Sequence, residues 1–157
     1  MMRFGAAYRR RPGRLTACGA VAVVLGAVGA VAVLAPTGAY AASTGSLVSA
    51  ANGKCLDVAN NSTADGATVH MWTCYPTVAS QKWTLADDGS VRSQGKCLDV
   101  ANNSTANGAV VHIWTCYATV TTQKWTLTAA GDLVNAASGK CLDIRDNNQA
   151  DGAPLQI

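Results

Sequence analysis

Glutamate is absent from this sequence of 157 residues, so all nine acidic residues are aspartates. The absence excludes catalysis by paired glutamates and the His-Glu-x-x-His class of zinc hydrolases. A Gly-x-Ser-x-Gly nucleophile motif is also missing, and no window shows the apolar period of a helix. We therefore expect no enzymatic activity of the chain's own, and no cofactor or metal.

Positive charge is concentrated in residues 1–41 and is scarce elsewhere. Residues 1–41 hold five arginines and no acidic residue, whereas residues 42–157 hold seven basic and nine acidic residues. A nucleic-acid-binding domain needs a basic surface on its folded part, so we expect no nucleic-acid partner. The stretch 42–157 suffices for one small domain but not for two.

Residues 1–41 have the pattern of a secretory signal peptide. The arginines are followed by an unbroken run of small apolar residues at 19–35 and then by Ala39-Tyr40-Ala41, which suits a signal peptidase. We predict cleavage after Ala41 and a secreted, extracellular domain at 42–157 without a stable membrane anchor. A retained membrane anchor is the alternative, although the apolar run is short for it.

Cysteine usage also fits an exported protein. Five cysteines follow the leader, and an odd number leaves one thiol, Cys141, without a partner in the mature chain. The separation between Cys55 and Cys74 in the sequence is repeated between Cys97 and Cys116. Export favours a disulfide within each of these two pairs. A metal site that adds His70 or His112 to these cysteines is the alternative.

An internal repeat organises residues 42–157. The segment Lys54–Val58 recurs as Lys96–Val100 and, with one change, as Lys140–Ile144. Between Lys54–Leu85 and Lys96–Leu127, 26 of 32 positions are identical. A period of about 40 residues indicates repeated units that bury their apolar faces against one another. We place the units at about 45–86, 87–128 and 129–157.

Each unit is predicted to contain four short strands. A Cys-Leu-Asp-Val strand leads through an Asn-rich loop to an Asp-Gly or Asn-Gly turn, whose positive φ angles favour a tight hairpin. A β-branched and aromatic strand follows, and Gln-Lys-Trp-Thr-Leu alternates polar and apolar residues to close the unit. We expect an all-β fold in which Trp83 and Trp125 belong to the core.

Three motifs carry a family resemblance, namely Lys-Cys-Leu-Asp-Val, Trp-x-Cys and Gln-x-Trp. Over about residues 45–157 the chain resembles ricin B-type lectins, which include the family-thirteen carbohydrate-binding modules of secreted bacterial glycosidases. The resemblance implies a β-trefoil, a six-stranded barrel capped by three hairpins, with one shallow sugar pocket per unit. Ile157 precedes the third Trp-x-Cys, so we expect a truncated third repeat and association through its open strand edge.

A sugar pocket needs a hydroxyl acceptor, a flat aromatic ring and an amide or imidazole. The resemblance places these groups at Asp57, His70, Trp72 and Gln81 in the first unit, at Asp99, His112, Trp114 and Gln123 in the second, and at Asp143 and Gln156 in an incomplete third site. Three structural alternatives remain. The two tryptophans can belong to the core, and the aspartates of the first two units can accept bonds from backbone amides of the Asn-rich loop. His70 and His112 can simply bond to the neighbouring aspartate instead of a ligand.

The expected function is sugar binding without catalysis, with galactose-, xylan- or arabinan-type ligands. Ser80 and Thr122 stand where the family's strongest binders carry Asn, and their shorter side chains argue against strong galactose-type recognition. The alternatives are a secreted protein-interaction or inhibitor trefoil, or the remnant of an accessory domain of a glycoside hydrolase.

Overall fold

A computed structural model describes residues 43–157 of the chain. The predicted signal peptide, residues 1–41, lies outside this part. Within residues 43–157, no helix has the length and apolar character needed to cross a membrane.

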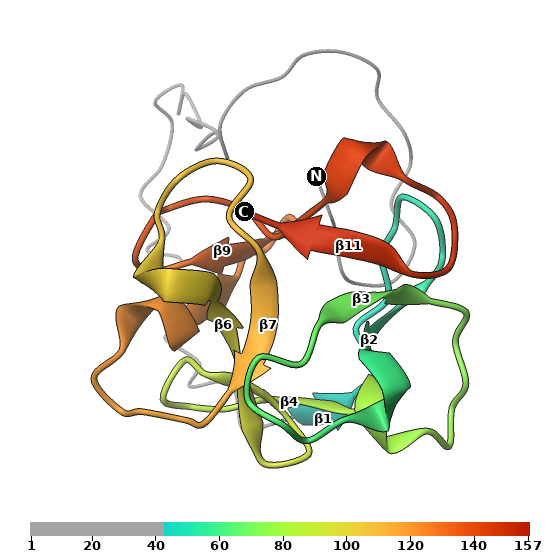
Figure 1. The fold of residues 1–157 in the computed structure, drawn as a ribbon, viewed down its shortest axis with the longest axis horizontal. Coiled ribbons are helices and arrows are strands. Elements are labelled where there is room, and N and C mark those ends of the chain that lie inside the picture. The colour runs from blue at the N-terminus through green and yellow to red at the C-terminus, as the bar shows by residue number, and fades with distance from the viewer. Residues whose placement is uncertain (1–42) are drawn as a thin grey trace, which may run out of the picture.

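The described chain folds into short strands joined by loops and single turns of 3₁₀ helix (Figure 1). The strands are β1 (Ser43–Gly45), β2 (Cys55–Val58), β3 (Val69–Trp72), β4 (Trp83–Leu85), β5 (Val91–Ser93), β6 (Lys96–Val100), β7 (Val111–Trp114), β8 (Trp125–Leu127), β9 (Leu133–Asn135), β10 (Asp143–Ile144) and β11 (Ala153–Gln156). The 3₁₀ turns are η1 (Ala59–Asn61), η2 (Ala79–Gln81), η3 (Ala101–Asn103), η4 (Thr121–Gln123) and η5 (Arg145–Asn147). The all-β prediction is confirmed.

Three antiparallel hairpins, β2–β3, β6–β7 and β10–β11, repeat with the same register. Val58 lies opposite Val69, Val100 opposite Val111, and Ile144 opposite Leu155. The hairpins also contact one another, because β11 pairs with β3 and bridges join Thr68 to His112 and Val110 to Gln156. The ends of β3, β7 and β11 therefore meet around an approximate threefold axis.

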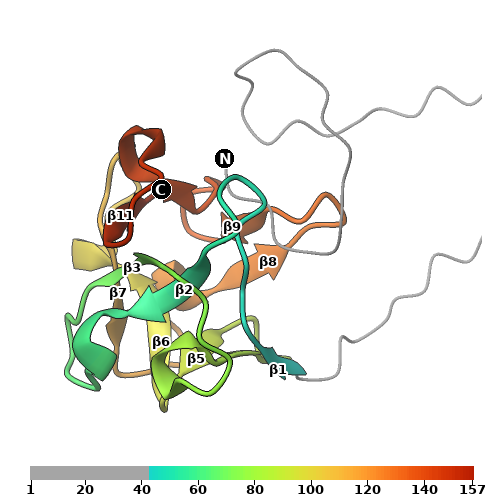
Figure 2. The ribbon, with the colours of Figure 1, turned by 90° about the vertical axis from the view of Figure 1, so that its right-hand side faces the viewer.

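The remaining strands are β1, β4, β5, β8 and β9, of which β1, β8 and β9 lie on the side of the molecule away from β3, β7 and β11 (Figure 2). β4 pairs with both β1 and β5, and β8 pairs with β9. A bridge between Ser90 and Lys124 connects these two groups of strands. Trp83 and Trp125 are almost fully buried in the core, and each indole Nε1–H donates to a hairpin carbonyl, that of Leu56 or Leu98, at 2.9 Å. The prediction that these two tryptophans belong to the core is confirmed.

Both predicted disulfides are present, Cys55–Cys74 and Cys97–Cys116. Each joins the first strand of a hairpin to the segment just after the second strand. Cys74 and Cys116 are therefore not available as thiolate ligands, which overturns the metal-site alternative. Cys141 is disulfide-bonded as well, so the expectation that it lacks a partner is corrected.

Two local predictions are also corrected. Gln81 belongs to the 3₁₀ turn η2 and not to a strand, because its side chain bonds to the backbone of its own unit. The Asp-Gly and Asn-Gly dipeptides do not form two-residue hairpin turns. In each of these dipeptides only the glycine has a positive φ, of 80° to 84°. The dipeptide ends a longer loop, which begins with residues in the left-handed region such as Asn60 and Asn61. Asparagine tolerates this conformation better than most residues.

Candidate functional site

The alternation of β3 divides its side chains between the core and the surface. Val69 and Met71 are fully buried, whereas His70 and Trp72 point outward. Asp57 lies opposite His70 in the register of β2 and β3, and successive strand positions face opposite sides of the sheet. Asp57, His70 and Trp72 are thus brought together on the outer face of the first hairpin.

The contacts among these three side chains define a small polar and aromatic site. His70 Nε2 lies 3.3 Å from Asp57 Oδ2, and the imidazole stacks beside the Trp72 indole with ring centroids 5.1 Å apart. Trp72 is 37% exposed, although it is a large apolar side chain. The indole thus belongs to the surface and not to the core, which removes the alternative of a core tryptophan.

The second hairpin builds the same arrangement from β6 and β7. Asp99 lies opposite His112, and His112 stacks beside Trp114 with centroids 5.3 Å apart. Trp114 is again 37% exposed. The separation of His112 Nε2 from Asp99 Oδ2 is longer here, 3.8 Å. The duplicated sequence therefore gives two sites with the same arrangement of residues, which differ in the separation of histidine and aspartate.

The two aspartates are buried without support from backbone amides. Within the described residues, Asp57 Oδ1 and Asp99 Oδ1 have no hydrogen-bond partner, and the other oxygen of each faces the histidine. This removes the second structural alternative. Burial raises the pKa of Asp99, but interactions with His112, Thr122 and Gln123 together outweigh it, so that the net pKa is lowered and the carboxylate is favoured.

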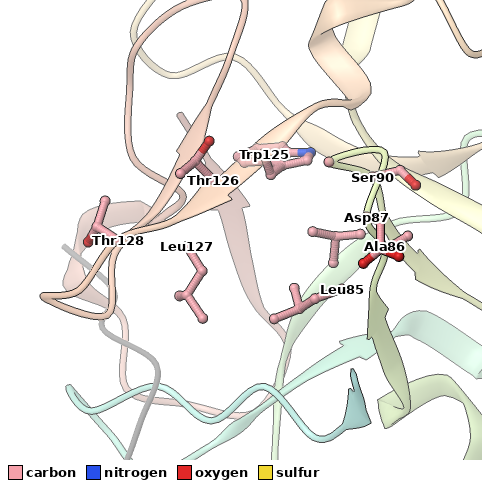
Figure 3. Close-up of a pocket in the computed structure, with 10 residues that line it drawn as sticks. Leu85, Ala86, Asp87, Ser90, Trp125, Thr126, Leu127 and Thr128 are labelled. Atoms are coloured by element: carbon pink, nitrogen blue, oxygen red, sulfur yellow. The ribbon is translucent and has the colours of Figure 1, made fainter. Parts of the chain in front are cut away.

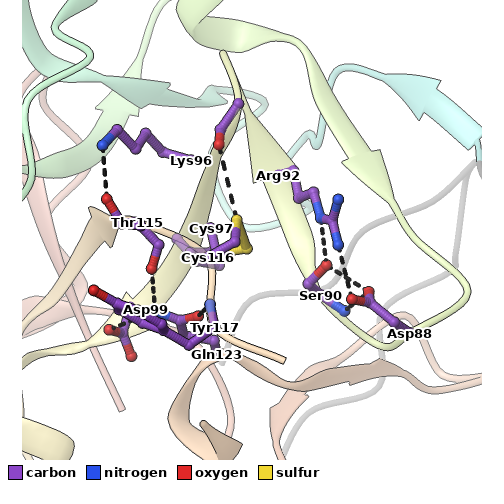
Figure 4. The surroundings of a disulfide bond; sticks show 12 residues. Asp88, Ser90, Arg92, Lys96, Cys97, Asp99, Thr115, Cys116, Tyr117 and Gln123 are labelled. Carbon is purple, nitrogen blue, oxygen red and sulfur yellow. Dashed lines mark hydrogen bonds and ion pairs between the residues drawn. A yellow bond between two sulfur atoms is a disulfide. The ribbon is translucent and has the colours of Figure 1, made fainter. Parts of the chain in front are cut away.

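The glutamines of the Gln-x-Trp motifs lie beneath the sites and hold the loop that follows the indole. Gln81 Oε1 accepts from the Tyr75 amide at 2.7 Å, and Gln81 Nε2 donates to the Thr73 carbonyl at 3.0 Å. Gln123 makes the equivalent bonds and also donates to Asp99 Oδ2 at 3.1 Å (Figure 4). Both glutamines are about 1% exposed, so the geometry favours a positioning role for them over direct contact with a ligand.

Each site opens into a shallow pocket, of about 280 Å³ in the first unit and about 270 Å³ in the second. Loop residues that the sequence reasoning did not select also line them, namely Asn60, Asn61, Tyr75, Val78, Asn102, Asn103, Tyr117 and Val120. Tyr75 and Tyr117 are about half exposed. The sequence signal that could have identified these two tyrosines is their position directly after Trp-x-Cys in both repeats.

The third unit keeps only part of this set. Gln156 Nε2 donates to Asp143 Oδ2 at 3.2 Å, so Gln156 takes the position of the histidines. Arg145 stands where the other units have Ala59 and Ala101, and its Nε donates to Gln156 Oε1 at 3.2 Å. No exposed indole of this unit is present among the described residues. The structure therefore brings Asp143 and Gln156 together without an aromatic platform.

A larger cavity, of about 350 Å³, lies between β8 and the turn that joins β4 to β5 (Figure 3). Its lining is mainly aliphatic, with Leu85, Val91 and Leu127, and its one aromatic residue, Trp125, is only 5% exposed. A sugar needs an accessible aromatic face together with polar groups that converge on its hydroxyls. This cavity offers no accessible aromatic ring, so we do not assign the site to it.

Comparison with known proteins decides the family. The family described as "Ricin-type beta-trefoil lectin domain" matches residues 43–157. The chain belongs to this family. Accordingly, the chain is a β-trefoil lectin domain, and such domains are binding modules. A search of curated protein sequences finds no match.

Solved structures agree with the assignment of this ricin-type lectin domain. The designed threefold-symmetric protein ThreeFoil is 38% identical, with a TM-score of 0.65 over 72% of this chain and 87% of that one. The agglutinin from Abrus precatorius is 29% identical, with a TM-score of 0.66 over 73% and 42% of the two chains. A galactanase from Clostridium thermocellum is 29% identical, with a TM-score of 0.65 over 72% and 26%. The lectin domain thus spans less than half of the agglutinin and about a quarter of the galactanase.

Proposed function

We propose that this lectin domain is a secreted, non-catalytic module that binds sugar rings through two pockets, one in each of the first two units. The observation that carries the proposal is the exposed indole beside a buried carboxylate, present twice with the same arrangement of residues. The two disulfides support an extracellular location, because such bonds persist in oxidising compartments.

The groups in each pocket match the two kinds of surface that a sugar ring offers. The apolar C–H face of the ring stacks on the indole of Trp72 or Trp114. Ring hydroxyls donate to the carboxylate of Asp57 or Asp99, which accepts only. The imidazole of His70 or His112 bridges the platform and the carboxylate, and it can bond a further hydroxyl.

The position where strong family binders carry Asn bears on which sugar is bound. Ser80 and Thr122 are nearly fully buried, and Thr122 Oγ1 donates to Asn103 Oδ1 at 3.1 Å. Thr122 thus helps to hold the Asn-rich loop in place, and Asn103 itself lines the pocket. We propose that amides of this loop read the hydroxyls that the missing Asn would read, with galactan, xylan and arabinan as the ligand classes.

Two pockets on one rigid domain suit a repeating ligand. A shallow pocket buries little ligand surface, so each site alone binds weakly. Engagement of both sites by one polysaccharide raises the overall affinity by ~10²–10⁴ where the spacing fits. The near identity of the two pockets favours such a repeated small ligand over a single protein partner, which is the alternative function.

Retention on immobilised polysaccharides tests the proposal. We expect the domain to be retained on at least one of galactan, xylan and arabinan, and to elute with the matching free sugar. Trp72→Ala should weaken retention, and Trp72→Ala/Trp114→Ala should abolish it. Lack of retention on all three columns, or unchanged retention of the double variant, would contradict the proposal. A stoichiometric protein partner that free sugar does not displace would favour the protein-interaction alternative.

A further inference from the structure

The turns of the first and third hairpins contact the neighbouring unit close to that unit's indole. The amide of Gly152 in the third unit donates to the Met71 carbonyl in the first at 2.9 Å. A Cβ on Gly152 would lie 3.7 Å from Cζ3 of Trp72, so the turn backbone lies against the indole. Gly66 of the first unit approaches Trp114 of the second in the same way, at 3.6 Å.

The aspartate before each of these glycines bonds to the residue that follows the indole. Asp151 accepts from the Thr73 amide at 2.7 Å, from Thr73 Oγ1 at 2.9 Å and from Lys54 Nζ at 2.6 Å. The carbonyl of Thr73 is held from the other side by Gln81. The backbone next to Trp72 is therefore fixed by one residue of its own unit and one of the neighbouring unit.

The second site repeats this arrangement with its other neighbour. Asp65 of the first unit accepts from Thr115 Oγ1 at 2.8 Å and from Lys96 Nζ at 2.7 Å, and Gln123 holds the Thr115 carbonyl. Lys96 is the largest cause of the lowered pKa of Asp65, which shows that the contact favours the ionised form. At the boundary between the second and third units, Asn107 occupies the position of Asp65 and Asp151. Lys140 Nζ donates there to the Thr105 carbonyl.

We propose that Asp151 and Asp65 are positioning residues that act across unit boundaries, Asp151 for the Trp72 platform and Asp65 for the Trp114 platform. Each platform is then supported by a turn from another unit, whose aspartate lies 78 positions after Thr73 or 50 positions before Thr115 in the chain. The consequence for sugar binding rests on the proposed function above, whereas the consequence for the indoles does not.

The pairing of sites and turns predicts a crossed pattern that a general loss of stability would not produce. Asp151→Asn should weaken binding at the first site about threefold to tenfold and leave the second site unchanged. Asp65→Asn should have the opposite selectivity. The natural Asn107 shows that asparagine is accepted at this turn, so both variants should fold.

The ¹H–¹⁵N signals of the indole groups provide the test, with Trp72 and Trp114 assigned by the Trp72→Phe and Trp114→Phe variants. We expect Asp151→Asn to shift the Trp72 signal alone and Asp65→Asn to shift the Trp114 signal alone. Thr73→Ser, which keeps both donors to Asp151, should preserve the Trp72 signal, whereas Thr73→Val should move it. Equal shifts of both indoles in each variant, or no shift of the paired indole, would overturn the proposal.

The sugar arm of the experiment uses methyl α-D-galactoside, xylobiose and arabinobiose as probes for the same variants. A crossed loss of affinity for a probe, matching the crossed indole shifts, would support both proposals. If the unmodified protein bound none of the probes while the indole shifts stayed crossed, the proposed function would fail and the positioning role would stand.

Discussion

The outer face of the first two hairpins differs from that of the third, although all three share one backbone plan. In each unit an aspartate on the first strand faces a polar side chain on the second, His70, His112 or Gln156. Only the first two units add an exposed indole within the described chain. In the third, the added residue is Arg145, which bonds to Gln156.

This difference separates what builds the hairpin from what builds the pocket. The buried residues of β10 and β11, Ile144 and Leu155, match those of the other hairpins, and the third hairpin packs without an indole. The aspartate and its polar partner therefore do not by themselves indicate a pocket, because in the described chain the third hairpin has both and lacks the indole. The indole is the feature that distinguishes a pocket from a plain hairpin surface.

The largest effect is expected on the inner side of a unit, at the tryptophan of Gln-x-Trp. Trp83→Ala removes a side chain that is 1% exposed and bonds to Leu56, so the free energy of unfolding should fall by about 3–5 kcal/mol. Trp72→Ala is the matched control and should cost about 1 kcal/mol or less, because its site is on the surface. Denaturant unfolding measures both, and equal losses would contradict the division between core and platform.

A smaller effect, on binding, is expected at the outer indoles. Trp72→Ala should weaken sugar binding at the first site about tenfold or more, since the stacking surface is lost. Trp114→Ala should do the same at the second site only. Site-resolved NMR titration of each variant measures this. If either substitution weakened both sites equally, the two pockets would not be independent.

The pH dependence of the second site should reveal the hydrogen bonds to Asp99. Its lowered pKa keeps the carboxylate ionised, so acidification should impair this site only below the ordinary aspartate pKa of about 3.9. Gln123→Leu removes one donor to Asp99 and should move the loss of binding to higher pH. Gln81→Leu removes the equivalent loop contacts in the first unit and leaves Asp99 untouched, so it serves as the control. The carboxyl ¹³C signal of Asp99 follows the titration, and a midpoint unaffected by Gln123→Leu would be inconsistent with this cause.

The smallest effect is expected in the third unit. Asp143→Asn should change sugar affinity by less than about twofold, because its hairpin offers no indole in the described chain. Asp57→Asn is the matched substitution and should weaken the first site clearly. Calorimetric titration distinguishes the two, and a large loss in Asp143→Asn would show that the third unit binds sugar after all.

The sequence repeat was sufficient to predict the hairpins, both disulfides and the burial of Trp83 and Trp125, because these depend on spacing and on strand alternation. It left open whether Trp72 and Trp114 lie in the core or at the surface. It was insufficient for Gln81, whose 3₁₀ turn arises from side-chain bonds to Thr73 and Tyr75. The contact of Asp151 with Thr73 joins residues 78 positions apart, so it depends on how the units pack. Strand periodicity within a unit carries no information about that packing.

Indole NMR signals recorded during titration with a sugar that retains the domain test the central claim most directly. We expect the Trp72 and Trp114 signals to move in a saturable manner, while those of Trp83 and Trp125 stay in place. Movement of the buried pair alone, or saturable binding that leaves Trp72 and Trp114 unperturbed, would contradict the placement of the sugar on the outer hairpin faces.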